Sequence, residues 1–253
     1  MKTKTFFLLL FLSLSSFSMF AQTDMKAEEA KVLSLLKQLR SKDENINREV
    51  VAIQFEKTLK TVLSKKESWN YRFPELRTYI SVATSDDKKI RTFGWDSLTG
   101  GSWHALRSFI QFKFGDKIHV VSLQDEKPMD EEEGNNILAD AVILEIYPFG
   151  KGYLFEAYGT YGSGHHHKVL AYFELNQEAL VRKAIFENDE VVYVFKIARK
   201  YKFDLLVNPE KATITHSEFL LDADSGFFLP TGKKVVLTFD GKQFIKQLKN
   251  EKP

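Results

Sequence analysis

Hydrophobic and polar positions follow two different periods along the chain. From Asp24 to Ser68 the apolar residues recur three or four positions apart, which is the spacing of one face of a helix. Ser41 and Glu44 have the spacing of a capping box at the start of a second helix. The pattern predicts an antiparallel helix pair, or one long broken helix, over 22–70. Its apolar stripe needs a partner surface and includes Val51, Phe55, Leu59 and Val62.

After Pro74 the period falls to two, which is typical of β-strands with one buried face. Tight turns separate the predicted strands, so we expect an antiparallel meander over 71–250 rather than parallel βαβ units. The chain is thus mainly β (α+β overall), and a barrel, a sandwich and a propeller-like stack all stay open. The expected strands are Leu76–Val82, Ile90–Trp95, Leu106–Phe114, Ile118–Leu123, Val142–Tyr147, Tyr153–Tyr158, Val169–Leu175, Leu180–Phe186, Val191–Ile197 paired with Tyr201–Val207, Thr213–Leu220 and Val235–Phe239.

The first residues have the order of a secretory signal peptide. Two lysines precede an apolar run from Phe6 to Leu14, and Ala21 supplies the small residue before a cleavage site. The run is shorter than the about 20 residues that span a bilayer, so an uncleaved anchor is the weaker alternative. We expect cleavage after Ala21, no membrane span in the mature chain, and a secreted or periplasmic protein.

The charge balance and the cysteine content limit the kinds of partner and of chemical site that we expect. The chain has 36 basic and 34 acidic residues, and removal of Lys2 and Lys4 with the leader leaves a formally neutral protein. This balance gives no reason to expect a nucleic acid or an anionic membrane as partner. The chain has no cysteine, which excludes disulfides, thiolate metal sites and a cysteine nucleophile.

Three consecutive histidines follow a glycine-rich turn and carry the strongest chemical signal. On a strand His165 and His167 point to one face, where two imidazoles can share a metal ion. His104 is the expected third ligand, with Asp96 as its partner or as a base, and a metal-bound water would then attack an ester, amide or phosphate. The competing interpretation is a polar surface turn without metal, because the cupin-like and HExxH motifs are absent.

Large aromatic residues near this turn suggest a second kind of site. Trp95, Trp103, Tyr158 and Tyr161 are predicted to form a ligand-binding platform, such as a cleft for a sugar or a peptide. The alternative is that these side chains belong to the core, as large aromatics in sheets often do. Asp222 to Gly226 resembles the start of a calcium loop, but the later ligands are missing and a hairpin turn is expected.

No complete nucleophile or phosphate-binding motif occurs in the sequence. The first hypothesis is therefore a non-catalytic binding or structural protein of a bacterial envelope or exterior, with unknown ligand and unknown cofactor. The alternative is a metal-assisted hydrolase centred on the histidine cluster at 165–167.

Overall fold

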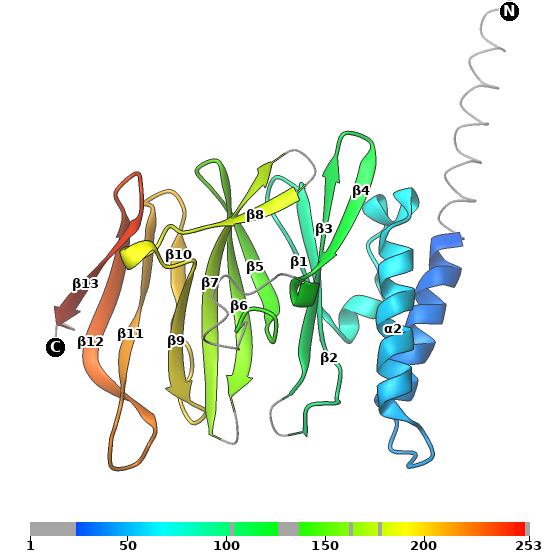
Figure 1. The fold of residues 1–253 in the computed structure, drawn as a ribbon, viewed down its shortest axis with the longest axis horizontal. Helices are drawn as coiled ribbons and strands as arrows, with labels where there is room; N and C mark the ends of the chain where they lie inside the picture. The colour runs from blue at the N-terminus through cyan, green and yellow to red at the C-terminus, as the bar shows by residue number, and fades with distance from the viewer. Residues whose placement is uncertain (1–23, 102–103, 126–136, 162–163, 177–178, 251–253) are drawn as a thin grey trace, which may run out of the picture.

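The computed structural model describes residues 24–101, 104–125, 137–161, 164–176 and 179–250 (Figure 1). Its helices are a first helix over 24–39, α2 (Arg48–Leu63) and the short 3-10 helices η1 (Lys66–Asn70), η2 (Leu76–Thr78), η4 (Leu123–Asp125) and η5 (Glu187–Asp189). Its strands are β1 (Ser81–Thr84), β2 (Ile90–Asp96), β3 (Leu106–Phe114), β4 (Lys117–Ser122), β5 (Val142–Phe149), β6 (Gly152–Tyr161), β7 (His165–Asn176), β8 (Ala179–Lys183), β9 (Val192–Ala198), β10 (Leu206–Asn208), β11 (Thr213–Leu221), β12 (Phe228–Phe239) and β13 (Phe244–Asn250).

The described strands form three antiparallel sheets. Sheet A has the order β1-β2-β3-β4, and sheet C has the order β10-β11-β12-β13. Sheet B has the order β5-β6-β7-β8, with β9 paired to the first half of β7. Figure 1 shows the helices, sheet A, sheet B and sheet C following one another along the long axis of the molecule. The predicted fold class, mainly β with N-terminal helices followed by antiparallel strands, is confirmed, and the three sheets lie in successive layers.

Three cores hold these layers together. In the first, the apolar stripe of α2 packs on the sheet A face that carries Phe93, Trp95 and Phe109. In the second, the opposite face of sheet A packs on sheet B. In the third, sheet B packs on Ile214, Leu237 and other residues of sheet C. Each middle sheet therefore buries both of its faces.

Strand alternation explains how sheet A can serve two cores. Phe93 points to the helices, whereas its neighbour Gly94 lies against Val142 of β5, and a Cβ atom at position 94 would collide with that side chain. Ser108 Oγ donates to the carbonyl of Ala141 and accepts from the amide of Ile143. Small residues on this face thus let the backbone of β5 approach sheet A closely.

Two local predictions at the N-terminal end are wrong. Asn47 caps α2, because its side chain accepts from the amide of Val50, whereas Ser41 Oγ accepts from Asp43 in the preceding turn. Leu76 to Thr78 forms a 3-10 helix, and β1 begins only at Ser81. Leu76 and Ile80 are buried in the first core and the three residues between them are exposed, so the segment has helical spacing and not the period of a strand.

Pairing near the C-terminus also differs from the prediction. Val192–Ala198 pairs with β7 and not with Tyr201–Val207, of which only the last residues join a strand, β10. Phe203 packs on Phe195 from the connecting segment instead. β13 was not predicted, because Phe244 is its single buried residue and polar residues dominate the rest of the strand.

No helix in the described residues is long and apolar enough to cross a membrane. The predicted leader, residues 1–21, lies outside the described part of the chain, and so does the acidic run Asp130 to Glu133.

Candidate functional site

The four predicted aromatic residues do not share one described surface. Trp95 is buried in the first core, where its ring packs on Phe55 and Phe109. Tyr158 lies on the sheet C side of sheet B, in contact with the rings of His166 and Phe203. Trp103 lies outside the described residues, and of Tyr161 only its place in β6 is described.

The three predicted strand histidines begin β7, and the structure gives each a different environment. His165 contacts the rings of Phe227 and Phe228 from sheet C. His166 Nε2 lies 3.3 Å from the carbonyl oxygen of Tyr201. Burial lowers the pKa of His166.

His167 is the most deeply buried of the three, with 3% of its surface exposed. Its ring packs over Gly159 on the neighbouring strand, where a Cβ atom would collide with it. Neither ring nitrogen has a hydrogen-bond partner in the described structure. Burial lowers the pKa of His167 to about 4, and the nearby charges of Lys196 and His166 act in the same direction. This imidazole is therefore neutral at neutral pH.

The structure brings His104 and Asp96 together at the end of β2. His104 Nδ1 lies 2.6 Å from Asp96 Oδ2, and the same carboxylate accepts from the amide of Leu98. Leu98 and His104 both have positive φ, at 57° and 53°, in the turn that links β2 to β3. The contact places Asp96 where a partner of His104 was predicted.

Among the described residues, no three or more His, Cys, Asp or Glu side chains are grouped so that they could hold a metal ion. The metal roles of His104, His165 and His167 therefore stay predictions.

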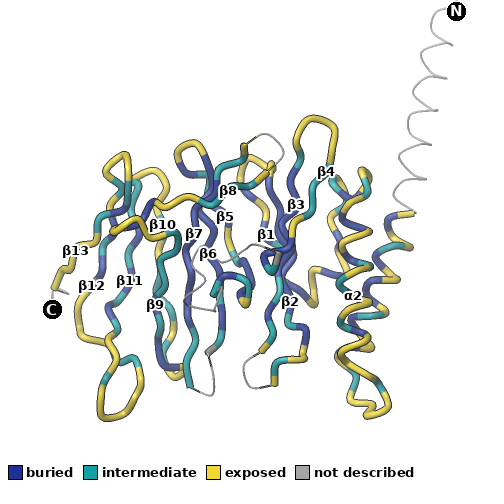
Figure 2. The backbone as a smooth tube through the Cα atoms, in the orientation of Figure 1, coloured by how far each residue is buried: buried dark blue, intermediate teal, exposed yellow. Residues whose placement is uncertain are grey.

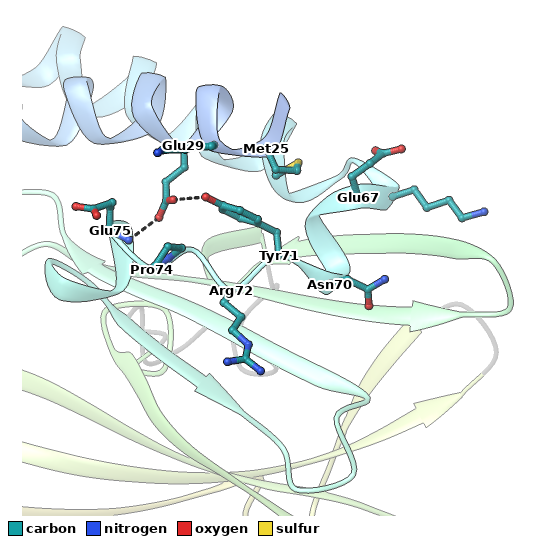
Figure 3. A pocket seen from close by; sticks show the side chains of 10 residues that line it. Met25, Glu29, Glu67, Asn70, Tyr71, Arg72, Pro74 and Glu75 are labelled. Carbon is teal, nitrogen blue, oxygen red and sulfur yellow. Dashed lines mark hydrogen bonds between the residues drawn. The ribbon is translucent and has the colours of Figure 1, made fainter. Parts of the chain in front are cut away.

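A large groove lies elsewhere, between the start of the first helix and the segment that follows α2 (Figure 3). We call it the helix groove. Its volume is about 820 Å³, within the range of small-molecule sites. The lining residues are Met25, Lys26, Glu29, Lys66, Glu67, Asn70, Tyr71, Arg72, Pro74 and Glu75.

Glu29 joins the two walls of the helix groove. Only 1% of this residue is exposed. Its carboxylate accepts from Tyr71 Oη at 2.7 Å and from the amides of Glu75 and Leu76 at 2.9 and 2.8 Å (Figure 3). Burial, followed by this contact with Glu29, raises the pKa of Tyr71, so its hydroxyl stays a donor.

Arg91, a residue of β2, anchors the segment that follows α2 to sheet A. Its guanidinium donates to the carbonyls of Ser68 and Tyr71 and to the side chain of Gln111. It also lies over the rings of Phe73 and Phe93. Burial lowers the pKa of Arg91 to about 10, which still leaves it charged at neutral pH.

Gln111 completes this anchor, because its amide nitrogen donates to the carbonyl of Leu63 and to Ser68 Oγ. The end of α2, the segment after it and sheet A are therefore joined by one buried polar network.

Neither the groove residues nor Arg91 were predicted, although the hydrophobic pattern contains a signal for Glu29 and for Arg91. Glu29 falls on the same helical stripe as Met25, Val32 and Leu36, so a carboxylate occupies a position with core spacing. Arg91 similarly interrupts the alternating face of β2 that carries Phe93 and Trp95. A charged residue at a buried position requires hydrogen-bond partners, so its presence in an apolar pattern indicates a buried polar network.

Comparison of the chain with protein-family models, with curated proteins and with solved structures found no match.

Proposed function

We propose that this protein is a secreted, non-catalytic binding protein and that the helix groove is its ligand site. Secretion follows from the predicted leader. The groove supplies the volume, the chemistry and the rigidity that a binding site needs.

The chemistry of the helix groove suits a small amphipathic ligand. Tyr71 and Pro74 offer apolar surface, and Met25, which is almost fully buried, also lines the groove. The exposed charges around them have both signs, with Lys26 and Arg72 against Glu75. Ligand sites commonly combine an apolar lining with a few polar groups that fix orientation.

The observation that carries the proposal is the set of three hydrogen bonds to Glu29. They join the first helix to Tyr71, Glu75 and Leu76 across the groove, so its walls are fixed before any ligand enters. A preorganised site loses less conformational entropy when it binds. The carboxylate of Glu29 therefore serves to position the walls of the groove.

A methyl-NMR titration tests this proposal. After the leader, methionine occurs only at positions 25 and 129, so ¹³C-methyl labelling of the processed protein gives one signal from the groove and one internal control. The probes are indole-3-acetate, hexanoate, phenethylamine and phenylalanine amide. At least one should shift the Met25 signal in a saturable way and leave Met129 in place.

Charge variants show whether such a probe sits in the groove. Lys26→Glu combined with Lys66→Glu should change the affinity for a charged probe several-fold. The matched control, Lys57→Glu on exposed α2 surface, should not. The proposal is wrong if no probe shifts Met25, or if Lys57→Glu has the same effect as the groove variant.

The metal-assisted hydrolase stays the second candidate, and the 2.6 Å contact between His104 and Asp96 favours it. An imidazole oriented by a carboxylate is a common arrangement at metal and proton-transfer sites. The tagless protein should then bind zinc or nickel stoichiometrically, and His165→Ala/His167→Ala should abolish this binding. Absence of bound metal, measured by elemental analysis after incubation, would remove this candidate.

A further inference from the structure

The β11–β12 hairpin ends in a cluster of exposed apolar side chains. Leu220, Leu221 and Phe227 are 57%, 60% and 40% exposed. Leu220 and Leu221 are adjacent on a strand and point to opposite faces, so both faces of the hairpin end meet solvent. Figure 2 shows this end as an exposed loop that extends beyond the buried strands of sheets B and C. Several large exposed apolar side chains at one end of a soluble protein mark a candidate interaction site.

A groove of about 390 Å³ adjoins the same hairpin. Leu220 and Phe228 form its hairpin side, and Phe195 and Lys196 of β9 form part of the opposite side. We call the hairpin end and this groove together the hairpin surface.

The hairpin surface carries both signs of charge. Asp222 and Asp224 lie in the turn, where Asp222 accepts from the amide and hydroxyl of Ser225. Arg199, Lys200 and Lys202 are exposed in the turn that follows β9.

Ring contacts place this basic turn beside the hairpin. The ring of Tyr201 lies 5.4 Å from that of Phe219, and the ring of His165 lies 5.1 Å from that of Phe227. The amide of Arg199 donates to the carbonyl of Gly164, the residue before His165. Acidic, apolar and basic groups therefore follow one another across one end of the molecule.

We propose that the hairpin surface binds a second copy of this chain. A two-fold axis through the apolar residues would place the acidic turn of one copy opposite the basic turn of the other, and the reverse. The exposed apolar side chains on the facing side of each copy would then be removed from water. The surface supplies both halves of the required charge complementarity itself, which favours a second copy as the occupant. An anionic membrane fits less well, because Asp222 and Asp224 lie in the turn at the tip of the hairpin and would be repelled by anionic headgroups.

Sedimentation equilibrium of the protein, expressed with its own leader and purified from the periplasm, tests the proposal. We expect a reversible dimer. Leu221→Ser with Phe227→Ser should weaken dimerisation more than ten-fold. The matched control Leu206→Ser changes an equally exposed leucine of sheet C, away from the hairpin end, and should leave the dimer unchanged. Far-UV circular dichroism confirms that each variant is folded.

Charge-reversal variants distinguish a specific dimer contact from non-specific hydrophobic association. Lys202→Asp and Asp224→Lys should each weaken the dimer about three-fold, as expected for exposed ion pairs, and the double variant should restore it. A monomer at all concentrations up to about 0.5 mM would overturn the proposal. Equal weakening by Leu206→Ser, or no restoration in the double charge variant, would also overturn it. Binding of a monomeric protein to phosphatidylglycerol vesicles would assign the surface to lipid instead.

Discussion

Two buried polar centres of this protein are equally hidden from water, but only one of them is hydrogen-bonded. The carboxylate of Glu29 and the guanidinium of Arg91 are both hydrogen-bonded to other groups of the protein. His167 is buried to a similar depth, yet both its ring nitrogens lack a partner in the described structure. The first centre joins secondary structure elements that are distant in sequence. The second tolerates burial only because its imidazole is neutral. Burial alone thus does not identify a structural polar group, whereas burial with complete hydrogen bonding does.

Replacement of Arg91 should have the largest effect. Arg91→Met removes the donors to the carbonyls of Ser68 and Tyr71 and to the side-chain oxygen of Gln111. The Ser68 carbonyl keeps the amide of Tyr71, whereas the Gln111 oxygen loses the donor described for it. We expect a loss of about 3 to 5 kcal/mol in the free energy of unfolding, measured by urea denaturation.

Arg77→Met is the control for Arg91, since Arg77 is exposed, and it should change stability by less than about 0.5 kcal/mol. Equal effects of the two variants would show that the network around Arg91 contributes nothing specific.

The same comparison explains what could be predicted from the sequence. The period-two strands and the helical stripe were predictable, because each reports one buried face along a continuous segment. The partner of β9 was not, because strand pairing depends on contacts between segments such as Phe195 and Phe203. The contact of Asp96 with His104 agrees with the role of partner or base that the sequence suggested for Asp96. The helix groove was missed because Glu29 and Tyr71 meet across 42 positions of the chain.

Acidification should have the next largest effect, and it acts on the histidine centre. The pKa of His167 is about 4 in the folded protein, below the ordinary value of 6.5. Unfolding therefore takes up a proton below pH 6.5, so stability is complete above that pH and falls between about 6.5 and 4. The loss is about 3 kcal/mol for His167, at 1.36 kcal/mol for each pKa unit. Burial also lowers the pKa values of His166 and His216, which adds to the loss.

The variant His167→Phe measures how much of the stability loss on acidification comes from His167. The variant should be at least as stable as the native protein at pH 7, because no hydrogen bond is lost, and its stability should fall less steeply toward pH 4.5. Urea denaturation at both pH values measures the difference. If the variant and the native protein lose the same stability on acidification, His167 is not the responsible group.

Glu29→Gln should have the smallest of the three effects. The amide keeps one acceptor oxygen but turns a donor toward the donors that surround it. We expect a loss of about 1 to 2 kcal/mol in the free energy of unfolding. Glu28→Gln is the matched control on the same helix, where two solvent-accessible lysines are the partners. Its loss should stay below about 1 kcal/mol.

The most direct test of a preformed helix groove is amide hydrogen exchange of Glu75 and Leu76 in the ligand-free protein. Both amides donate to the buried carboxylate of Glu29, although Glu75 itself is an exposed residue. We predict slow exchange at both positions, and faster exchange at both in Glu29→Gln. Exchange of Glu75 and Leu76 as fast as that of the exposed turn at Asp86 in the native protein would contradict a groove whose walls are fixed before a ligand arrives.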